Sequence, residues 1–192
     1  MLIRRAAAFL LLGLLCALAS VARAEDWKAK YPELVFAIIP AENASGVIGR
    51  FTPFTEYLSR ELGVPVKLQI VQDYAAVIEG QRAGQIHLAF YSATSYARAY
   101  LTGVKTEPFA IEVNGDGTRS YRAVLYVRKD SPYQTLEDLR GKNLGLVDPN
   151  SASGNTVPRY ALNKLGITPE KFFGKVVYTG SHENAIFALQ QG

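Results

Sequence analysis

The sequence predicts an α/β protein built from two similar lobes. Strand-like and helix-like segments alternate along the chain, which is typical of a largely parallel sheet covered by helices. The alternation then restarts after slightly more than a hundred residues, which indicates a second lobe of the same kind. A composition of 48% hydrophobic and 20% charged residues is that of an ordinary globular protein and argues against disorder.

The first 24 residues have the pattern of a cleavable signal peptide. Arg4 and Arg5 precede an apolar stretch at 6–18, and Ala22-Arg23-Ala24 supplies the small-x-small pattern for a cut after Ala24. The alternative is an uncleaved anchor helix, but the apolar stretch is shorter than the ~20 residues that a membrane span needs. We therefore expect the mature chain to be periplasmic.

Removing this leader changes what the composition implies. The leader holds three of the 21 basic residues and no acid, which leaves 18 basic residues against 17 acidic ones, a net charge of +1. A charge so small removes the bulk electrostatic case for a nucleic-acid or membrane-surface partner. The only cysteine, Cys16, also lies in the leader and follows Leu15, which does not suit lipoprotein attachment. Disulfides, thiolate metal sites and thiol catalysis are therefore excluded in the mature chain.

The first lobe is expected over residues 25–127. The apolar run at 34–39 ends at Pro40 and predicts a buried strand, whereas helical spacing of apolar residues at 51–62 predicts a helix that stops at Gly63. The same reasoning predicts strands at 66–71 and 86–91 and helices at 73–82 and 94–101. Two further strands are expected near 108–113 and 121–128, as part of an extended crossover to the second lobe.

The second lobe is expected over residues 128–192. It should contain a short helix at 135–139, strands at 143–147 and 176–178, and helices at 154–165 and 182–190. Leu165-Gly166 then corresponds to the helix stop at Leu62-Gly63, and Ser181-His182 opens a helix as Asp73-Tyr74 does. Chance agreement is the alternative, since all α/β chains share this rhythm. The third strand of the first lobe has no counterpart, so we expect a chain truncated before that strand of the second lobe.

The segment Asp148-Pro-Asn-Ser-Ala-Ser-Gly-Asn155 is the strongest local signal for a binding site. It joins a predicted strand to a predicted helix, and a helix start carries unpaired N–H groups and a partial positive charge. Two hydroxyls and a glycine there suit a small oxyanion, without any lysine or arginine. The plain alternative is helix capping by Ser153.

Three other side chains are candidates for contacts with the same ligand. His182 and Tyr74 open helices at strand–helix junctions, which face the crevice in open α/β sheets. Tyr121 begins the predicted crossover strand, from which its phenol could reach the cleft. The alternatives are a structural or solvated histidine and tyrosines that only pack. His87 is expected to be structural, and Tyr91 to pack beneath the cleft.

Other chemistries find no support in the sequence. It contains no Walker loop, no G-x-G-x-x-G and no G-x-S-x-G elbow. Two histidines without cysteine in the mature chain do not make a zinc site. We therefore expect no metal, no cofactor and no enzymatic activity. A hydrolase acting on a phosphorylated substrate would need a metal set or an activated nucleophile, and neither is evident.

Four segments together resemble the phosphate/phosphite/phosphonate-binding (PhnD-like) periplasmic proteins of ABC transporters. They are, in family order, Phe36-Ala-Ile-Ile-Pro-Ala-Glu-Asn43, Asp73-Tyr-Ala-Ala-Val-Ile-Glu-Gly80, Asp148–Asn155 with Pro158-Arg-Tyr160, and Gly180-Ser-His-Glu183. The resemblance implies a bilobal periplasmic-binding-protein architecture of type 2. It further implies a small phosphorus oxyanion as ligand and an ABC permease as partner. A periplasmic ligand-sensing domain of a signalling protein is the alternative role.

The resemblance also implies roles for the matching residues. Phenol hydroxyls would come from Tyr74 and Tyr121, and His182 would complete the shell. The oxyanion itself would lie against Ser151, the backbone of Ala152, Ser153 and Gly154. Family members often carry threonine where this chain has Ala152, so one side-chain donor is missing here.

Overall fold

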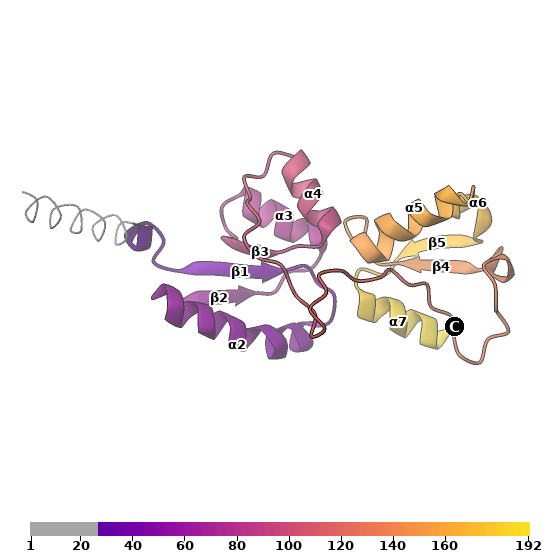
Figure 1. Ribbon diagram of the computed structural model, residues 1–192, viewed down its shortest axis with the longest axis horizontal. Coiled ribbons are helices and arrows are strands. Elements are labelled where there is room, and N and C mark those ends of the chain that lie inside the picture. The colour runs from indigo at the N-terminus through magenta and orange to yellow at the C-terminus, as the bar shows by residue number, and fades with distance from the viewer. Residues whose placement is uncertain (1–26) are drawn as a thin grey trace, which may run out of the picture.

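The computed structural model describes residues 27–192. It shows two α/β units, each with its own parallel sheet (Figure 1). The expected signal peptide, its cleavage after Ala24, and Cys16 lie outside the described residues. Within residues 27–192, no helix combines the length and the apolar character that a membrane crossing requires.

The first unit is a three-stranded parallel sheet with strand order β2-β1-β3. Its elements are β1 (Leu34–Ile38), α2 (Ala44–Leu62), β2 (Val66–Gln69), α3 (Tyr74–Arg82), β3 (Leu88–Phe90) and α4 (Ala93–Leu101). Helix α2 begins seven residues earlier than expected, because Asn43 caps its first turn by accepting from the amide of Gly46 at 2.9 Å. Glycines and Pro53 have low helix propensity and interrupt the apolar spacing of this stretch, so the sequence pattern did not indicate the full helix.

The second unit is a two-stranded parallel sheet in which β4 pairs with β5. Its elements are η1 (Glu137–Leu139), β4 (Asn143–Leu146), η2 (Ala152–Thr156), α5 (Val157–Lys164), α6 (Pro169–Phe172), β5 (Lys175–Tyr178) and α7 (His182–Gln191). The helix expected at 154–165 is divided into a π-helical turn, η2, and the α-helix α5. The short helix expected at 135–139 is a single 3₁₀ turn.

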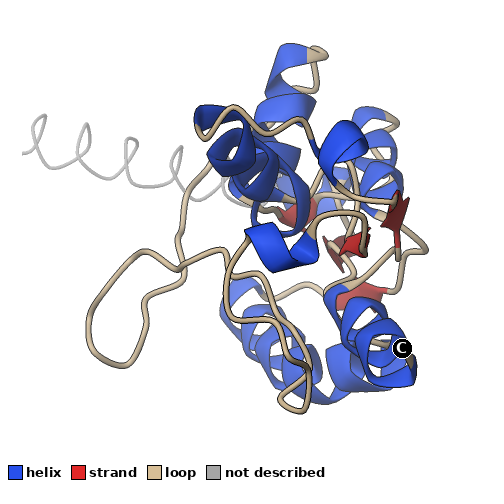
Figure 2. Cartoon of the chain, turned by 90° about the vertical axis from the view of Figure 1, so that its right-hand side faces the viewer, coloured by secondary structure: helices blue, strands red, loops and turns tan. Residues whose placement is uncertain are grey.

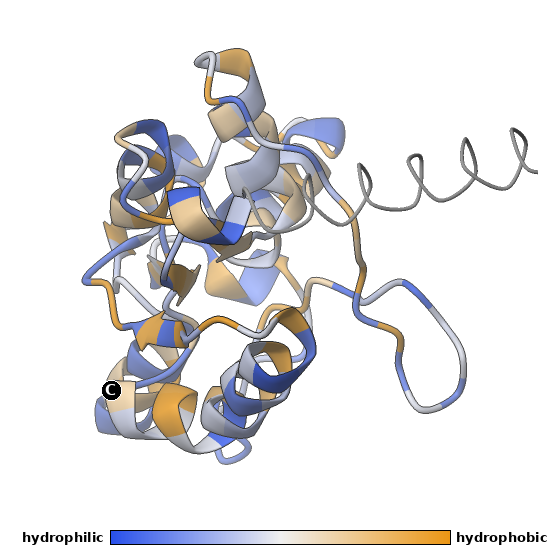
Figure 3. Ribbon diagram, turned by 90° about the vertical axis from the view of Figure 1, so that its left-hand side faces the viewer, coloured by the Kyte–Doolittle hydropathy of each residue, from blue (hydrophilic) through white to orange (hydrophobic). Residues whose placement is uncertain are grey.

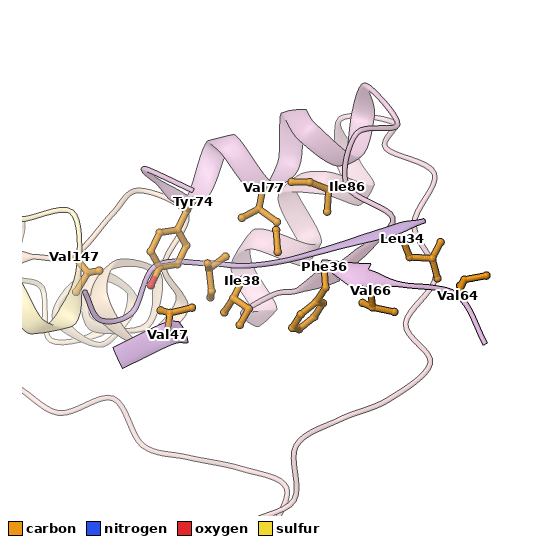
Figure 4. Close-up of a cluster of buried hydrophobic side chains, with 12 residues drawn as sticks. Leu34, Phe36, Ile38, Val47, Val64, Val66, Tyr74, Val77, Ile86 and Val147 are labelled. Atoms are coloured by element: carbon orange, nitrogen blue, oxygen red, sulfur yellow. The ribbon is translucent and has the colours of Figure 1, made fainter. Parts of the chain in front are cut away.

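The main core lies between the first sheet and its helices. It gathers buried residues of β1 and β2 with Val47 of α2 and Tyr74 and Val77 of α3 (Figure 4). Val147, which follows β4 of the second unit, belongs to the same cluster and lies beside Tyr74. The two units therefore meet through packed apolar side chains as well as through the connecting chain.

The carboxyl ends of β1 and β4 point toward each other (Figure 1). A backbone hydrogen bond from Glu183, in the first turn of α7, to the carbonyl of Ala41, in the loop after β1, spans 3.3 Å. Helices pack on both sides of the strands, as the orthogonal view shows (Figure 2). Loops at strand carboxyl ends form the ligand crevice in open α/β sheets, so a ligand-binding site is expected at this junction.

The prediction of two strands near 108–113 and 121–128 is wrong. Residues 105–128 are loop, and within the described chain neither β3 nor β4 pairs with them. Their alternating apolar residues are exposed, with Phe109 at 79% and Ile111 at 64% (hydrophobic positions along the loops are orange in Figure 3). Alternation describes a sequence suited to a strand, but a strand forms only where a neighbour offers a row of hydrogen bonds.

Candidate functional site

Two helix starts from different units present Tyr74 and His182 at the junction. Tyr74 is the first residue of α3, whose start is capped by Asp73, and His182 is the first residue of α7, capped by Ser181. Both capping residues have extended backbone and accept a hydrogen bond from the amide three residues on. The sequence correspondence between these two junctions is thereby confirmed in three dimensions.

The segment that follows β4 supplies a third helix start. Ser151 caps η2 by accepting from the amide of Gly154 at 3.0 Å. The plain alternative of a cap by Ser153 is therefore wrong. The hydroxyl of Ser153 makes no hydrogen bond among residues 27–192, and the amides of Ala152 and Ser153 lie in the first turn, where no intrahelical acceptor exists. One hydroxyl and two N–H groups are thus free to bind an anion.

The π-helical form of η2 widens this turn. The amide of Thr156 reaches the carbonyl of Ser151 at 3.1 Å, a bond that spans five residues. Single π turns inside helices occur frequently at functional sites because they displace backbone groups from the regular ladder. Gly154 lies within this turn, and a methyl group there would overlap the side chain of Val147. The glycine therefore lets the turn pack closely on the end of β4.

Tyr74 is held as a hydrogen-bond donor. Its side chain is 1% exposed, as is that of Ser151, whose hydroxyl is a neighbour of the phenol. Burial raises the pKa of Tyr74, the neighbouring Ser151 hydroxyl lowers it in part, and the negative charges of Asp148 and of an ionised Tyr121 raise it again. The net shift is upward, so the phenol keeps its proton at neutral pH.

His182 is half-buried at the start of α7, and this burial lowers the pKa of its imidazole below the ordinary value. Desolvation disfavours the charged form, and a helix start does so as well. The ring is therefore neutral near pH 7 before an anion arrives. A neutral imidazole offers one N–H donor, and a nearby anion would favour uptake of a proton from solvent, which provides two.

Tyr121 lies in the crossover loop and is 67% exposed. It is close enough to Tyr74 that its charge affects the pKa of that phenol, but it is not packed into the junction. Seven residues were predicted to bind the ligand. Five of them lie at the starts of α3 and η2: Tyr74, Ser151, Ala152, Ser153 and Gly154. His182 lies at the start of α7, and Tyr121 lies at the rim. Two open surface hollows, beside α3 and beside the C-terminal end of α7, contain none of these residues.

A polar cluster behind the η2 turn escaped the sequence reasoning. The side-chain oxygen of Asn155 accepts from Arg159 at 2.8 Å and from Tyr178 at 3.0 Å, and its amide donates to the carbonyl of Pro149 at 2.9 Å. Arg159 also pairs with Glu170 at 2.6 Å. This cluster ties α5, α6 and β5 to the loop that carries the donors. Arg159 belongs to the segment Pro158-Arg-Tyr160 that resembles the family, but only the fold brings it next to Asn155.

Asn150 also connects this loop to the first unit. Its carbonyl accepts from the hydroxyl of Ser92, and its side-chain oxygen from Nε of Arg98, both at 3.3 Å. His87 and Tyr91 lie elsewhere: Nδ1 of His87 accepts from the amide of Val35 at 3.0 Å, which is the structural role expected for it. Tyr91 donates to Gln81 at 2.9 Å, and burial raises its pKa to about 12.

The groups at this junction are suited to hydrogen-bond donation. Hydroxyl, phenol, imidazole and backbone N–H groups lie at three helix starts. Tyr74 shares a core cluster with Val147, whose carbonyl accepts from the amide of Gly180, just before α7. Asp148, the acid within the segment, has an oxygen occupied by the amide of Asn150 at 2.6 Å. Residues 27–192 contain no group of three or more histidine, cysteine or acidic side chains placed to hold a metal ion.

Two α/β units that meet at the carboxyl ends of their strands have the bilobal architecture of type 2 periplasmic binding proteins. Residues 36–192 match the family described as ABC transporter, phosphonate, periplasmic substrate-binding protein. The chain therefore belongs to this family, whose members are substrate-binding components of transporters.

Individual relatives agree with this assignment. The chain is 34% identical over 176 residues to the phosphonates-binding periplasmic protein of Escherichia coli K12, covering 90% of this chain and 51% of that protein. It is 29% identical over 171 residues to the phosphate-import protein PhnD of Mycolicibacterium smegmatis, covering 84% and 53%. A binding component of a phosphonate ABC transporter from Pseudomonas aeruginosa superposes with a TM-score of 0.77 at 31% identity, covering 83% and 54%. The chain spans about half the length of these relatives.

Proposed function

We propose that the protein is an extracytoplasmic solute-binding protein that captures a small phosphorus oxyanion, a phosphonate, phosphite or phosphate, between its two lobes. The observation that carries this proposal is the presence of donor groups at the starts of α3, η2 and α7, which adjoin Val147 at the end of β4. The relatives named for phosphonate binding and phosphate import support the ligand class. The captured anion would be passed to an ABC transporter permease.

The donor set suits a tetrahedral oxyanion. The free amides of Ala152 and Ser153 with the hydroxyl of Ser153 would hold one side of the anion, and the phenol of Tyr74 with the imidazole of His182 the other. Each charge-assisted hydrogen bond contributes ~1.5–3 kcal/mol. About five such bonds, discounted for the freedom lost on closure, account for the roughly −8 kcal/mol of a micromolar binder.

Binding would draw the two lobes together, as in the hinge closure of periplasmic binding proteins. We place the first lobe at 25–127 and the second at 128–192. In support, the guanidinium of Arg128 donates to the carbonyl of Gln190 at 3.1 Å, which ties the start of the second lobe to its last helix. Export would follow cleavage after Ala24, and N-terminal sequencing of periplasmic protein should begin at Glu25.

Calorimetry on the parent and on Tyr121→Phe tests the function. The parent should bind at least one of phosphate, phosphite and methylphosphonate with micromolar affinity, while sulfate serves as the competing tetrahedral anion. Tyr121 is mostly exposed, so removing its hydroxyl leaves the fold unchanged and deletes only a donor. If the variant binds like the parent, Tyr121 takes no part in the site. If the parent binds none of the phosphorus anions, the proposed function is wrong.

A further inference from the structure

Asn43 and Glu183 join the two lobes next to the proposed anion site. One carboxylate oxygen of Glu183, Oε2, accepts from the backbone amide of Asn43 at 2.6 Å, and the other, Oε1, accepts from the side-chain amide of Asn43 at 2.9 Å. The amide of Glu183 donates in turn to the carbonyl of Ala41 at 3.3 Å. Two hydrogen bonds therefore connect residues 140 positions apart in the chain, and a third lies beside them.

Neighbouring groups fix the orientation of the Asn43 side chain. Its oxygen accepts from the amide of Gly46 at 2.9 Å and from the hydroxyl of Ser45 at 2.6 Å, so it faces helix α2. Its NH₂ group must then face away from the helix, toward Glu183. One asparagine thus caps α2 in the first lobe and binds the start of α7 in the second lobe.

The position of Glu183 connects this contact to the ligand. Glu183 follows His182 directly in the first turn of α7, so a bond that holds its carboxylate against the first lobe also holds the imidazole over the junction. Asn150 makes further contacts with another helix of the first lobe, through Ser92, the N-cap of α4, and Arg98 within α4. The lobes are thus bonded directly at the start of α2 and along α4.

We propose that the Asn43–Glu183 pair is a latch that positions His182 and sets the affinity for the anion without touching it. This proposal rests on the proposed function. A ligand binds with an apparent affinity reduced by the fraction of molecules that hold the binding-competent arrangement. Bonds that exist only when the lobes are together raise that fraction, so weakening them weakens anion binding.

An exchange of amide and carboxylate between the two residues tests the latch. Asn43→Asp retains an excellent cap for α2 but places a carboxylate against that of Glu183. Glu183→Gln removes the charge and replaces one carboxylate oxygen with an NH₂ group. That NH₂ group cannot accept from either of the two N–H donors of Asn43. The double variant restores one donor and one acceptor across the contact. Asn163→Asp, on exposed α5 and away from the latch, is the control for added negative charge.

Calorimetry with methylphosphonate should show an affinity loss of about tenfold for Asn43→Asp and about threefold for Glu183→Gln, because like charges repel and a charge-assisted bond is lost. The double variant should return to within about threefold of the parent, which is the non-additivity expected of residues in contact. A double variant as weak as the product of the single changes, or Asn43→Asp binding like the control, would overturn the proposal.

The latch can also be measured without any ligand. The sequence from Glu25 onward contains no cysteine, so spin labels at Glu61→Cys on α2 and Lys171→Cys on α6 report one distance between the lobes. Asn43→Asp should shift this distance distribution to longer values, and the double variant should shift it back. An unchanged distribution in Asn43→Asp overturns the latch whether or not the parent binds an anion. Absence of binding by the parent, with the distance shift present, counts against the proposed function alone.

Discussion

Asp73 and Ser181 make the same hydrogen bond at the starts of α3 and α7. The side-chain oxygen of Asp73 accepts from the amide of Ala76 at 2.7 Å, and that of Ser181 accepts from the amide of Asn184 at 3.0 Å. Each cap orders a helix start that follows a parallel strand, and each is followed by the side chain proposed to contact the ligand. The internal repeat of the chain thus delivers Tyr74 and His182 to one junction from two lobes.

Ser153→Ala should weaken oxyanion binding by about tenfold and leave the melting temperature unchanged. The expected loss corresponds to one charge-assisted hydrogen bond at the lower end of its range, and the Ser153 hydroxyl has no partner within the described chain. Ser151→Ala is the contrasting variant, since it removes a helix cap worth ~0.5–2 kcal/mol and the hydroxyl that neighbours buried Tyr74. Calorimetry and thermal unfolding of both variants separate the two roles. A lower melting temperature for Ser153→Ala contradicts the assignment.

Gly154→Ala should destabilise the protein by ~1–3 kcal/mol, because the added methyl group overlaps the side chain of Val147 where η2 packs on the end of β4. Gly49→Ala is its matched control. Gly49 lies inside helix α2, and no atom would meet a methyl group there, so this change should stabilise by ~0.5–1 kcal/mol. Urea unfolding of both variants gives the comparison. Equal free energies of unfolding would mean that the close approach at Gly154 is not required.

Arg159→Lys should weaken anion binding about threefold to tenfold, although Arg159 is not expected to touch the ligand. Lysine cannot reproduce the planar contacts that join Asn155, Glu170 and Tyr178, and the loop held by Asn155 would loosen. Arg140→Lys is the control, because Arg140 forms an exposed ion pair with Glu137 that should contribute little. Affinity measured at one salt concentration suffices. Unchanged binding by Arg159→Lys would show that the cluster does not position the loop.

His182 should make the ligand-free protein less stable as the pH falls from 7 to 5. Its pKa is lowered on folding by burial, so the unfolded chain binds the proton more readily and stability is lost as the pH drops below the unfolded value of about 6.5. His182→Gln keeps a polar side chain without this titration. Its free energy of unfolding should therefore fall less than that of the parent over the same pH range. Parallel pH profiles would show that His182 is not shielded from water.

The local sequence was sufficient to predict most of the regular structure. Apolar runs predicted strands β1, β2, β3, β4 and β5 within a few residues. Strand β1 is buried along almost its whole length, as expected of a parallel strand covered on both faces. Helix stops at glycine were equally reliable: Gly63 and Gly166 both have positive φ, which glycine adopts without strain. Capping residues marked the starts of α3 and α7 for the same local reason, since a cap is decided within four residues.

Only the tertiary structure decided what depends on distant partners. Residues 108–113 and 121–128 have alternation typical of strands, yet they remain loop because the described chain offers them no strand to pair with. Three further contacts could be identified only in the folded structure. They are the cap of η2 by Ser151 in place of Ser153, the cluster of Arg159 with Asn155, and the bond of Asn43 to Glu183. Propensities and caps act between neighbours in sequence, whereas pairing, burial and charge contacts depend on which distant residues the folded chain places side by side.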